Sequence, residues 1–174
     1  MTFSSGSRVA LMAFALAACS PTLDWRDVRV DGGALTALFP CRPDRQVRSV
    51  PLAGSTVRME MAACAAGDVT FAISFFDVAE PAAVGPALEA LRAATVANIR
   101  AAAPSAAPYA LHGATPNPFA NRLEAAGQRP DGSAIRAHAV FFARGLRVYQ
   151  ASVIGAEPTP DSVNGFIGAL KLAL

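Results

Sequence analysis

Alternating apolar and polar residues divide the first half of the chain into strands. Residues 25–30 alternate and end at Asp31-Gly32-Gly33, a sequence typical of a turn, and residues 34–39 then complete a hairpin. Residues 57–63 and 69–76 show the same two-residue period, which predicts strands with one buried face. The clearest apolar side belongs to the last of these strands and carries Val69, Phe71, Ile73 and Phe75. Antiparallel strands therefore dominate the predicted first half.

In the middle of the chain the period changes to that of a helix. Between Glu80 and Ala103 apolar residues recur every three or four positions, which predicts one long amphipathic helix. Its apolar face carries Val84, Leu88, Leu91, Thr95 and Ile99. The segment 104–118 is rich in Pro, Ala and Ser, and it is long for a loop in a compact domain. We expect it to be either mobile or a binding segment.

The second half predicts three consecutive strands and a short helix. Residues 119–128 and 134–142 flank Asp131-Gly132, a dipeptide favoured in tight hairpins, and residues 146–154 follow after another turn. Strands joined in this way pair antiparallel. Thr159 is a good N-cap for a terminal helix because its hydroxyl can accept a hydrogen bond from the first turn.

This order of elements predicts an α+β fold. We expect an antiparallel sheet of about six strands, one long central helix and a short C-terminal helix, arranged like an α/β/α sandwich. The second face of the sheet is either covered or exposed to water. The 174 residues fit one domain. Residues 1–18 are expected to form a leader, residues 19–24 a tether, and residues 25–174 the folded domain.

A short apolar run near the amino terminus predicts export. Residues 9–18 are apolar over ten positions, whereas a helix that spans a bilayer needs about twenty. The run ends in Leu16-Ala17-Ala18-Cys19, which resembles the lipobox of bacterial lipoproteins. In that family the leader is removed before the cysteine, which then carries a diacylglyceryl group and an acylated amino group.

The lipobox resemblance implies a membrane partner and a location. Cys19 would carry fatty acyl chains such as palmitate, and several chains give stable attachment where one would be marginal. Ser20 at the following position resembles the pattern of lipoproteins sent to the outer membrane, here to its periplasmic face. An ordinary cleavable leader that happens to precede a cysteine remains the alternative.

The other two cysteines predict a disulfide. Cys41 and Cys64 are an even pair in a chain expected to reach an oxidising compartment. Their bond would close a loop of 24 residues and stabilise the fold by about 3 kcal/mol on the chain-entropy estimate. Their spacing suits neither a redox motif nor a zinc site, so we expect a structural bond.

The charge balance argues against a nucleic-acid partner. Without the leader, 14 Lys and Arg face 13 Asp and Glu, because the leader holds only Arg8. Such a balance gives no broad field to gather nucleic acid or an anionic membrane surface. A local basic stretch, Arg42, Arg45 and Arg48, is either a solvated loop or a recognition loop.

The sequence contains no recognisable catalytic motif. His112 and His138 are the only histidines, and neither lies beside a sequence-local metal ligand. The G-x-S-x-G, G-x-G-x-x-G and Walker patterns are absent. Distant Ser, His and Asp side chains could still converge in the fold. We therefore expect no metal, no cofactor and no enzymatic activity.

Four residues are candidates for contact with a partner. Trp25 is either an anchor for a partner or a packing residue at the edge of the domain. Arg144, Arg147 and Tyr149 surround the last turn between strands, where they form either a recognition patch or a charged face of the sheet.

The order of landmarks along the chain resembles the PsbP/Mog1-like fold group, which includes many small exported bacterial proteins. The features that carry the resemblance are Phe39-Pro40-Cys41-Arg42-Pro43, the helix at 82–103, the hairpin from Arg136 to Gln150 and the Phe166-x-x-x-Leu170 segment. The resemblance implies an α/β/α or α+β sandwich. It also implies binding to a larger protein complex rather than catalysis, although fold likeness alone does not establish function.

These observations leave three hypotheses for function. The first is a noncatalytic binding or accessory module that assists a protein complex of the cell envelope. The second is a small-molecule site or an enzymatic site between the sheet and segment 104–118. The third is a purely structural role in the envelope.

Overall fold

The structure is a computed structural model that describes residues 23–173. The predicted leader and Cys19 lie outside the described residues. Of the described residues, 49% are in strands and 19% in helices, and the strands form two sheets of seven and three strands. β structure therefore determines the architecture.

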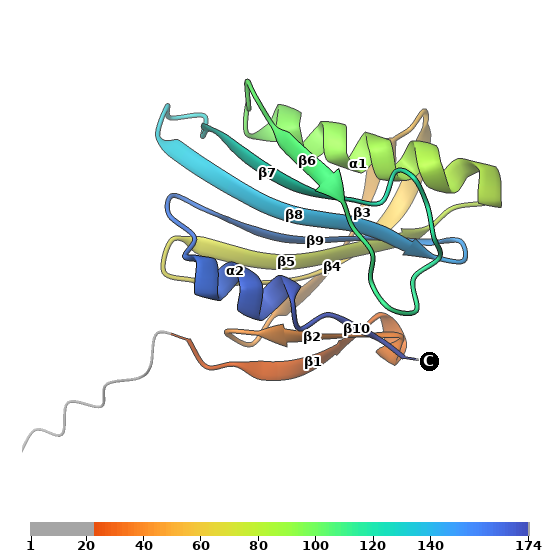
Figure 1. Cartoon of the computed structure of the whole chain (residues 1–174), viewed down its shortest axis with the longest axis horizontal. Helices are drawn as coiled ribbons and strands as arrows, with labels where there is room; N and C mark the ends of the chain where they lie inside the picture. The colour runs from red at the N-terminus through yellow and green to blue at the C-terminus, as the bar shows by residue number, and fades with distance from the viewer. Residues whose placement is uncertain (1–22, 174) are drawn as a thin grey trace, which may run out of the picture.

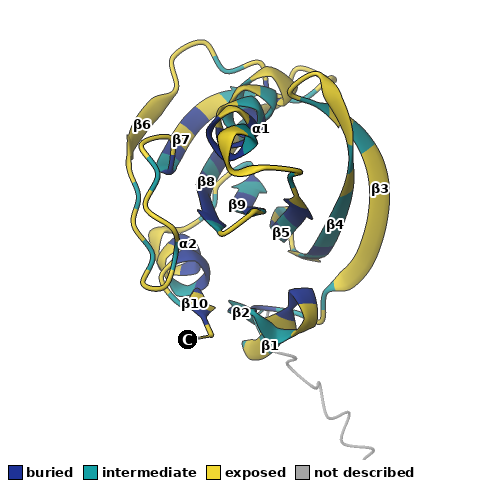
Figure 2. Ribbon diagram, turned by 90° about the vertical axis from the view of Figure 1, so that its right-hand side faces the viewer, coloured by how far each residue is buried: buried dark blue, intermediate teal, exposed yellow. Residues whose placement is uncertain are grey.

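The larger sheet has seven strands, and every neighbouring pair in it is antiparallel. From one edge to the other its strands are β3 (Asp44–Leu52), β4 (Ser55–Ala66), β5 (Val69–Asp77), β9 (Arg147–Gly155), β8 (Ala134–Arg144), β7 (Asn121–Gln128) and β6 (Ser105–Pro108). The predicted hairpin around Asp131-Gly132 is confirmed, since Gln128 pairs with Ala134. Figure 2 shows that the sheet curves strongly, so that its two edge strands stand on either side of a helix.

The smaller sheet contains the two ends of the described chain. Its strands are β1 (Arg26–Val30), β2 (Leu35–Phe39) and β10 (Lys171–Leu172), in the order β1-β2-β10. A 3₁₀ turn at Asp31–Gly33 joins β1 to β2. The predicted N-terminal hairpin is thus confirmed, but it belongs to a separate sheet that β10 completes.

Two helices cover opposite faces of the larger sheet (Figure 1). The long helix α1 (Val84–Asn98) follows a 3₁₀ turn at Pro81–Ala83 and lies in the hollow of the curved sheet. The short helix α2 (Pro160–Ile167) packs with the small sheet on the other face. As predicted, Thr159 caps α2, and its hydroxyl accepts a hydrogen bond from the Ser162 amide at 3.2 Å.

Burial on both faces gives the protein two cores. On β8 the adjacent residues Phe141 and Phe142 are both buried, yet Phe141 packs in the core beneath α1 and Phe142 packs in the core beneath the small sheet. A strand buried on both faces has a continuous apolar run instead of an alternating one. The run from Ala139 to Ala143 has this character, and all five residues are buried.

The predicted α+β fold, with about six strands arranged like an α/β/α sandwich, is wrong. Residues 23–173 are mostly β, with ten strands in two sheets, and a small sheet covers much of the face that a helical layer would cover in such a sandwich. Two strands of the large sheet escaped the prediction because they are edge strands with exposed side chains: β3 contains Arg45 and Arg48 of the predicted basic loop, and β6 lies in segment 104–118. The helix is also shorter than predicted, because Arg100 adopts a positive φ of 51° just after it.

Candidate functional site

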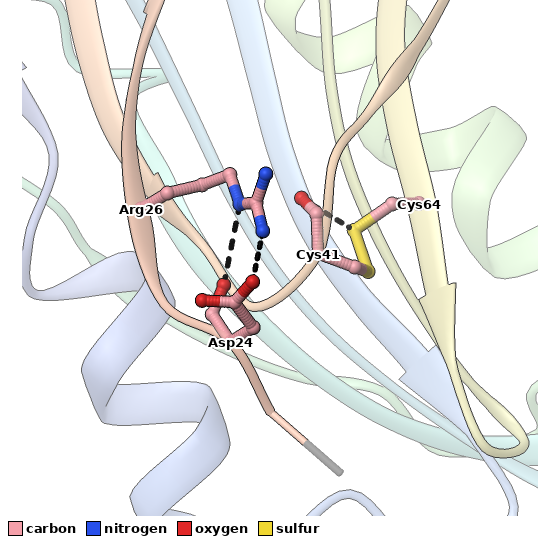
Figure 3. The surroundings of a disulfide bond; sticks show 4 residues. All are labelled: Asp24, Arg26, Cys41 and Cys64. Carbon is pink, nitrogen blue, oxygen red and sulfur yellow. Dashed lines mark hydrogen bonds and ion pairs between the residues drawn. A yellow bond between two sulfur atoms is a disulfide. The ribbon is translucent and has the colours of Figure 1, made fainter. Parts of the chain in front are cut away.

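The predicted disulfide is present, and it lies beside the point where the chain enters the fold. Cys41 and Cys64 are bonded, with their Cα atoms 6.0 Å apart. The amide of Asp24 donates to the carbonyl oxygen of Pro40 at 2.7 Å, so the entering chain is fastened to the residue that precedes Cys41. Figure 3 shows the ion pair between Asp24 and Arg26 in the same neighbourhood.

A shallow groove with several arginines lies next to this entry point. It is open to solvent, has a volume of about 720 Å³ and runs between β1 and the start of β3. We call it the basic groove, and its lining residues are Arg26, Asp27, Val28, Arg29, Arg42, Pro43, Asp44 and Arg45. Arg45 bridges the two sides, because its Nη2 donates to the carbonyl oxygen of Arg29 at 2.6 Å.

A buried carboxylate joins the small sheet to the large one. The side chain of Asp31 is 0% exposed and its backbone φ is 49°. Its Oδ1 accepts from the amide of Leu35 at 2.8 Å, and its Oδ2 accepts from the hydroxyl of Tyr149 at 2.5 Å. Burial, followed by the hydrogen bond to Asp31, raises the pKa of Tyr149 well above its usual value. Tyr149 therefore remains a hydrogen-bond donor at neutral pH.

Arg147 extends this cluster to the surface. Its guanidinium donates two hydrogen bonds to the carboxylate of Asp77, both at 2.7 Å, and lies 3.5 Å from Asp31. It also lies over the ring of Phe75, 5.5 Å from the ring centroid. The hydrogen bond from Arg147 lowers the pKa of Asp77, and the same bond raises the pKa of Arg147. The cluster fixes the two sheets relative to each other, and its charged groups are occupied by one another.

A second polar cluster lies on β7 and β8, beside the start of α2. Arg122, Glu124 and His138 line a small pocket of about 240 Å³. Nδ1 of His138 is 3.8 Å from Oε1 of Glu124, and Nε of Arg122 is 3.5 Å from the same oxygen. Both nitrogens are buried without a hydrogen-bond partner among the described residues. Buried polar atoms of this kind usually have water or a ligand as their partner.

Burial lowers the pKa of His138 despite the opposing effect of Glu124, and Arg122 and Arg136 lower it further. The unfolded chain therefore takes up a proton at a higher pH than the folded protein does, so acidification favours unfolding. We expect the free energy of unfolding to decrease as the pH falls from about 7.5 to 5.5, through the ordinary histidine range. The measurement is urea denaturation across this range.

The matched variants for this pH effect are His138→Gln and His112→Gln. His138→Gln removes the half-buried imidazole and should flatten the pH dependence, whereas His112→Gln changes an exposed position and should preserve it. If the free energy of unfolding of both variants depends on pH as steeply as that of the wild-type protein, His138 is not responsible for the acid sensitivity.

A wider groove lies on the other face of the sheet, between the β3–β4 hairpin and the start of α1. Its volume is about 670 Å³. Apolar side chains on its lining include Leu52, Val57, Phe76 and Val78. Arg58, Asp77 and Glu80 add charge to the same lining. We call it the α1 groove, and its mixture of apolar and charged side chains is typical of a surface that binds another molecule.

No protein-family model matches this sequence, and no curated protein matches it. Among solved structures, the chain is similar to a protein from Bacteroides thetaiotaomicron, with a TM-score of 0.48 and 12% identity over 85% of this chain and 48% of that one. The chain thus spans about half the length of that protein. It is also similar to a protein of unknown function from Pseudomonas aeruginosa, described as a candidate regulator, with a TM-score of 0.39 and 19% identity over 80% of this chain and 85% of that one. At these TM-scores neither likeness supports an argument about function.

The structure separates the four predicted partner-binding residues. Trp25 is half-buried and packs edge-on against Phe71. Tyr149 is buried, Arg147 binds Asp77, and Arg144 donates to the carbonyl oxygen of Ala173. These contacts give each residue a role in packing, and their contact with a partner stays a prediction.

Segment 104–118 is attached to the rest of the fold. Its first part forms the edge strand β6, and further on the amide of Thr115 donates to the carbonyl oxygen of Ala143 at 2.8 Å. Tyr109 packs beside Phe142, with the ring centroids 6.1 Å apart. The polar pocket that contains His138 is lined instead by β7, β8 and the start of α2.

Sequence reasoning missed Asp31, Asp77, Arg122 and Glu124 as members of polar clusters. In the observed register Glu124 lies opposite His138, whereas a two-residue turn at Asp131-Gly132 would place Ala139 there, so the predicted hairpin does not reveal this pair. Within residues 23–173 no group of three or more His, Cys, Asp and Glu could hold a metal ion. No helix in the same range is long and apolar enough to cross a bilayer.

Proposed function

We propose that this protein is a lipid-anchored component of the cell envelope whose folded domain is a noncatalytic binding module for a larger protein complex. The observation that carries the proposal is the Cys41–Cys64 disulfide, located where the chain that follows the lipobox-like Cys19 enters the fold. Structural disulfides persist in exported proteins and are rare in the reducing cytosol. The disulfide and the lipobox resemblance thus support the same compartment. The localisation that we propose is the periplasmic face of the outer membrane.

The proposed anchor would hold the domain close to its membrane. Cys19 precedes Leu23, the first described residue, by four positions. An extended chain of that length spans at most about 14 Å. A domain on so short a tether meets partners in or next to the membrane far more often than partners at a distance.

The shape of the surface supports binding. The basic groove and the α1 groove are both open: the first lies between β1 of the small sheet and the start of β3, and the second lies between the β3–β4 hairpin and the start of α1. The charged residues that are most buried, Asp31 and the groups around it, are engaged in holding the two sheets together. Open grooves of mixed polarity suit a protein surface better than the enclosed site of a small substrate.

The test is cell fractionation and in-cell cross-linking of the tagged protein, with Cys19→Ser as the unanchored control. We expect the wild-type protein to be recovered with membranes and to incorporate labelled palmitate. Mass spectrometry of its cross-linked products should show enrichment of one envelope complex. Cys19→Ser should lose the label entirely and most of that enrichment.

Two results would contradict this proposal in different ways. A Cys19→Ser variant that stays with the membrane fraction to the same extent would rule out the lipid anchor. A protein that is anchored and folded but enriches no envelope protein would rule out the accessory role.

Small-molecule binding is a second candidate function, favoured by the two unpartnered buried nitrogens of Arg122 and His138. A pocket of about 240 Å³ would hold a small polar molecule between these side chains and Glu124. A thermal-shift screen of amino acids and dicarboxylates tests this function, and Glu124→Gln together with His138→Gln should abolish any stabilisation found. No shift with any member of the panel would leave bound water as the partner of these atoms.

A further inference from the structure

We propose that the basic groove binds the phosphate groups of anionic phospholipids in the membrane that anchors the chain. The inference deepens the proposed function and rests on the lipid anchor at Cys19. It assigns a class of ligand to a surface that the sequence analysis identified only as a local basic stretch.

The position of the groove is the first argument. The amide of Asp24 is hydrogen-bonded to the carbonyl oxygen of Pro40. Two residues after Asp24 and two residues after Pro40, the chain reaches Arg26 and Arg42, which both line the groove. Five positions separate Cys19 from Asp24, which an extended chain spans in at most about 18 Å. An anchor at Cys19 would therefore keep the groove next to the lipid headgroups at all times.

The charge of the groove is the second argument. Four of its eight lining residues are arginines and two are aspartates. Arg26 pairs with Asp24, but within residues 23–173 no carboxylate lies at ion-pair distance from Arg29, Arg42 or Arg45. All three are exposed. The four arginines and two aspartates of the lining leave the groove with a local excess of positive charge, which the near-neutral charge of the whole chain hides.

The chemistry of the side chains selects the ligand. A guanidinium group presents paired N–H donors that match two oxygens of a phosphate, and it is weakly hydrated compared with an ammonium group. Arg45 uses Nη2 on the carbonyl of Arg29, and this bond holds its guanidinium across the groove. The groove is broad and open at about 720 Å³, which suits headgroups that approach from a surface.

This contact would also orient the domain. The small sheet and α1 lie on opposite sides of the large sheet (Figures 1 and 2). With the edge of β1 against the headgroups, the α1 groove would face away from the bilayer, where a protein partner could reach it. Lipid binding and partner binding would then use different faces of one domain.

The experiment uses the mature lipoprotein reconstituted into vesicles of phosphatidylcholine, with and without phosphatidylglycerol. Hydrogen–deuterium exchange is measured at residues 26–29 and 42–45. One arginine near an anionic membrane surface increases the affinity for that surface about fivefold, so three arginines together correspond to a roughly hundredfold preference for anionic over neutral vesicles. We expect exchange in both segments to slow at least about fivefold when phosphatidylglycerol is present, and high salt should reverse the effect.

Two triple variants separate the groove from general charge. Arg29→Gln/Arg42→Gln/Arg45→Gln should lose the slowing, whereas Arg92→Gln/Arg100→Gln/Arg136→Gln removes the same charge from other surfaces and should keep it. Equal exchange on both kinds of vesicle, with the protein still bound to them, overturns the inference while the anchor stands. Failure of the protein to remain on either vesicle instead contradicts the proposed function. If millimolar inorganic phosphate alone slows hydrogen–deuterium exchange in both segments on neutral vesicles, the inference is also overturned, since the groove would then be a site for free anions.

Discussion

Replacement of Asp31 by Ala is expected to lower the free energy of unfolding by about 3–5 kcal/mol, the range for removing one partner of a buried charged cluster. The Asp31 side chain is 0% exposed and accepts hydrogen bonds from the Leu35 amide and the Tyr149 hydroxyl, with Arg147 at 3.5 Å. Its loss would leave buried donors from both sheets without an acceptor. Guanidinium denaturation followed by circular dichroism measures the change.

Asp77 provides the matched control, because it binds the same arginine from the surface. The Asp77 side chain is 58% exposed, whereas that of Asp31 is buried. An exposed ion pair contributes about 0–1 kcal/mol, so Asp77→Asn should cost far less than Asp31→Ala. Tyr149→Phe removes one hydrogen bond to a charged group and should cost about 1.5–3 kcal/mol. Equal losses for Asp31→Ala and Asp77→Asn would show that burial of Asp31 is not what makes it important.

The Asp31 cluster could not have been predicted from the sequence. Asp31-Gly32-Gly33 is typical of an exposed turn, and the structure does contain a turn there. The partner Tyr149 is 118 residues away, and only the packing of the small sheet on the large one brings the two together. The local sequence pattern therefore predicts the turn correctly, but it does not indicate that the carboxylate of Asp31 is buried.

The sequence predicts the two strands of the His138 cluster but not their register. A two-residue turn at Asp131-Gly132 would pair Glu124 with Ala139, whereas the observed register, in which Gln128 pairs with Ala134, places Glu124 opposite His138. Side chains directly opposite each other in such a pair are close enough to interact. The one-residue difference in register is what hides this site from the sequence.

The prediction of the fold class failed at the two edge strands of the larger sheet. Side chains along β3 are mostly exposed on both faces, so Arg45 and Arg48 obscure any alternation and the strand has the pattern of a loop. β6 consists of Ser, Ala and Pro, all exposed, and its strand character comes only from pairing with β7. Alternation reveals a strand only when one face is buried, and edge strands do not meet that condition here.

The second large effect is expected at Gly127, where β7 meets the end of α1. A Cβ atom at this position would lie 1.9 Å from the carbonyl oxygen of Ile99. That oxygen already accepts a hydrogen bond from the amide of Gln128 at 2.7 Å. Only glycine allows the backbone at the helix end to approach β7 so closely. Gly127→Ala must therefore separate the helix end from the strand and lose this bond.

We expect Gly127→Ala to lower the free energy of unfolding by about 3 kcal/mol, at the upper end for an overpacked site, and the melting temperature by roughly 6–12 °C. Ala126→Ser is the matched control, because it adds an atom to the neighbouring, exposed position of the same strand. It should change stability by less than about 0.5 kcal/mol. Calorimetry of both variants tests the pair, and a Gly127→Ala protein as stable as Ala126→Ser would mean that α1 does not end against β7. Because Ile99 is buried in the core beneath α1, a displaced helix end would also expose that core to water, which hydrogen exchange in residues 96–101 would detect.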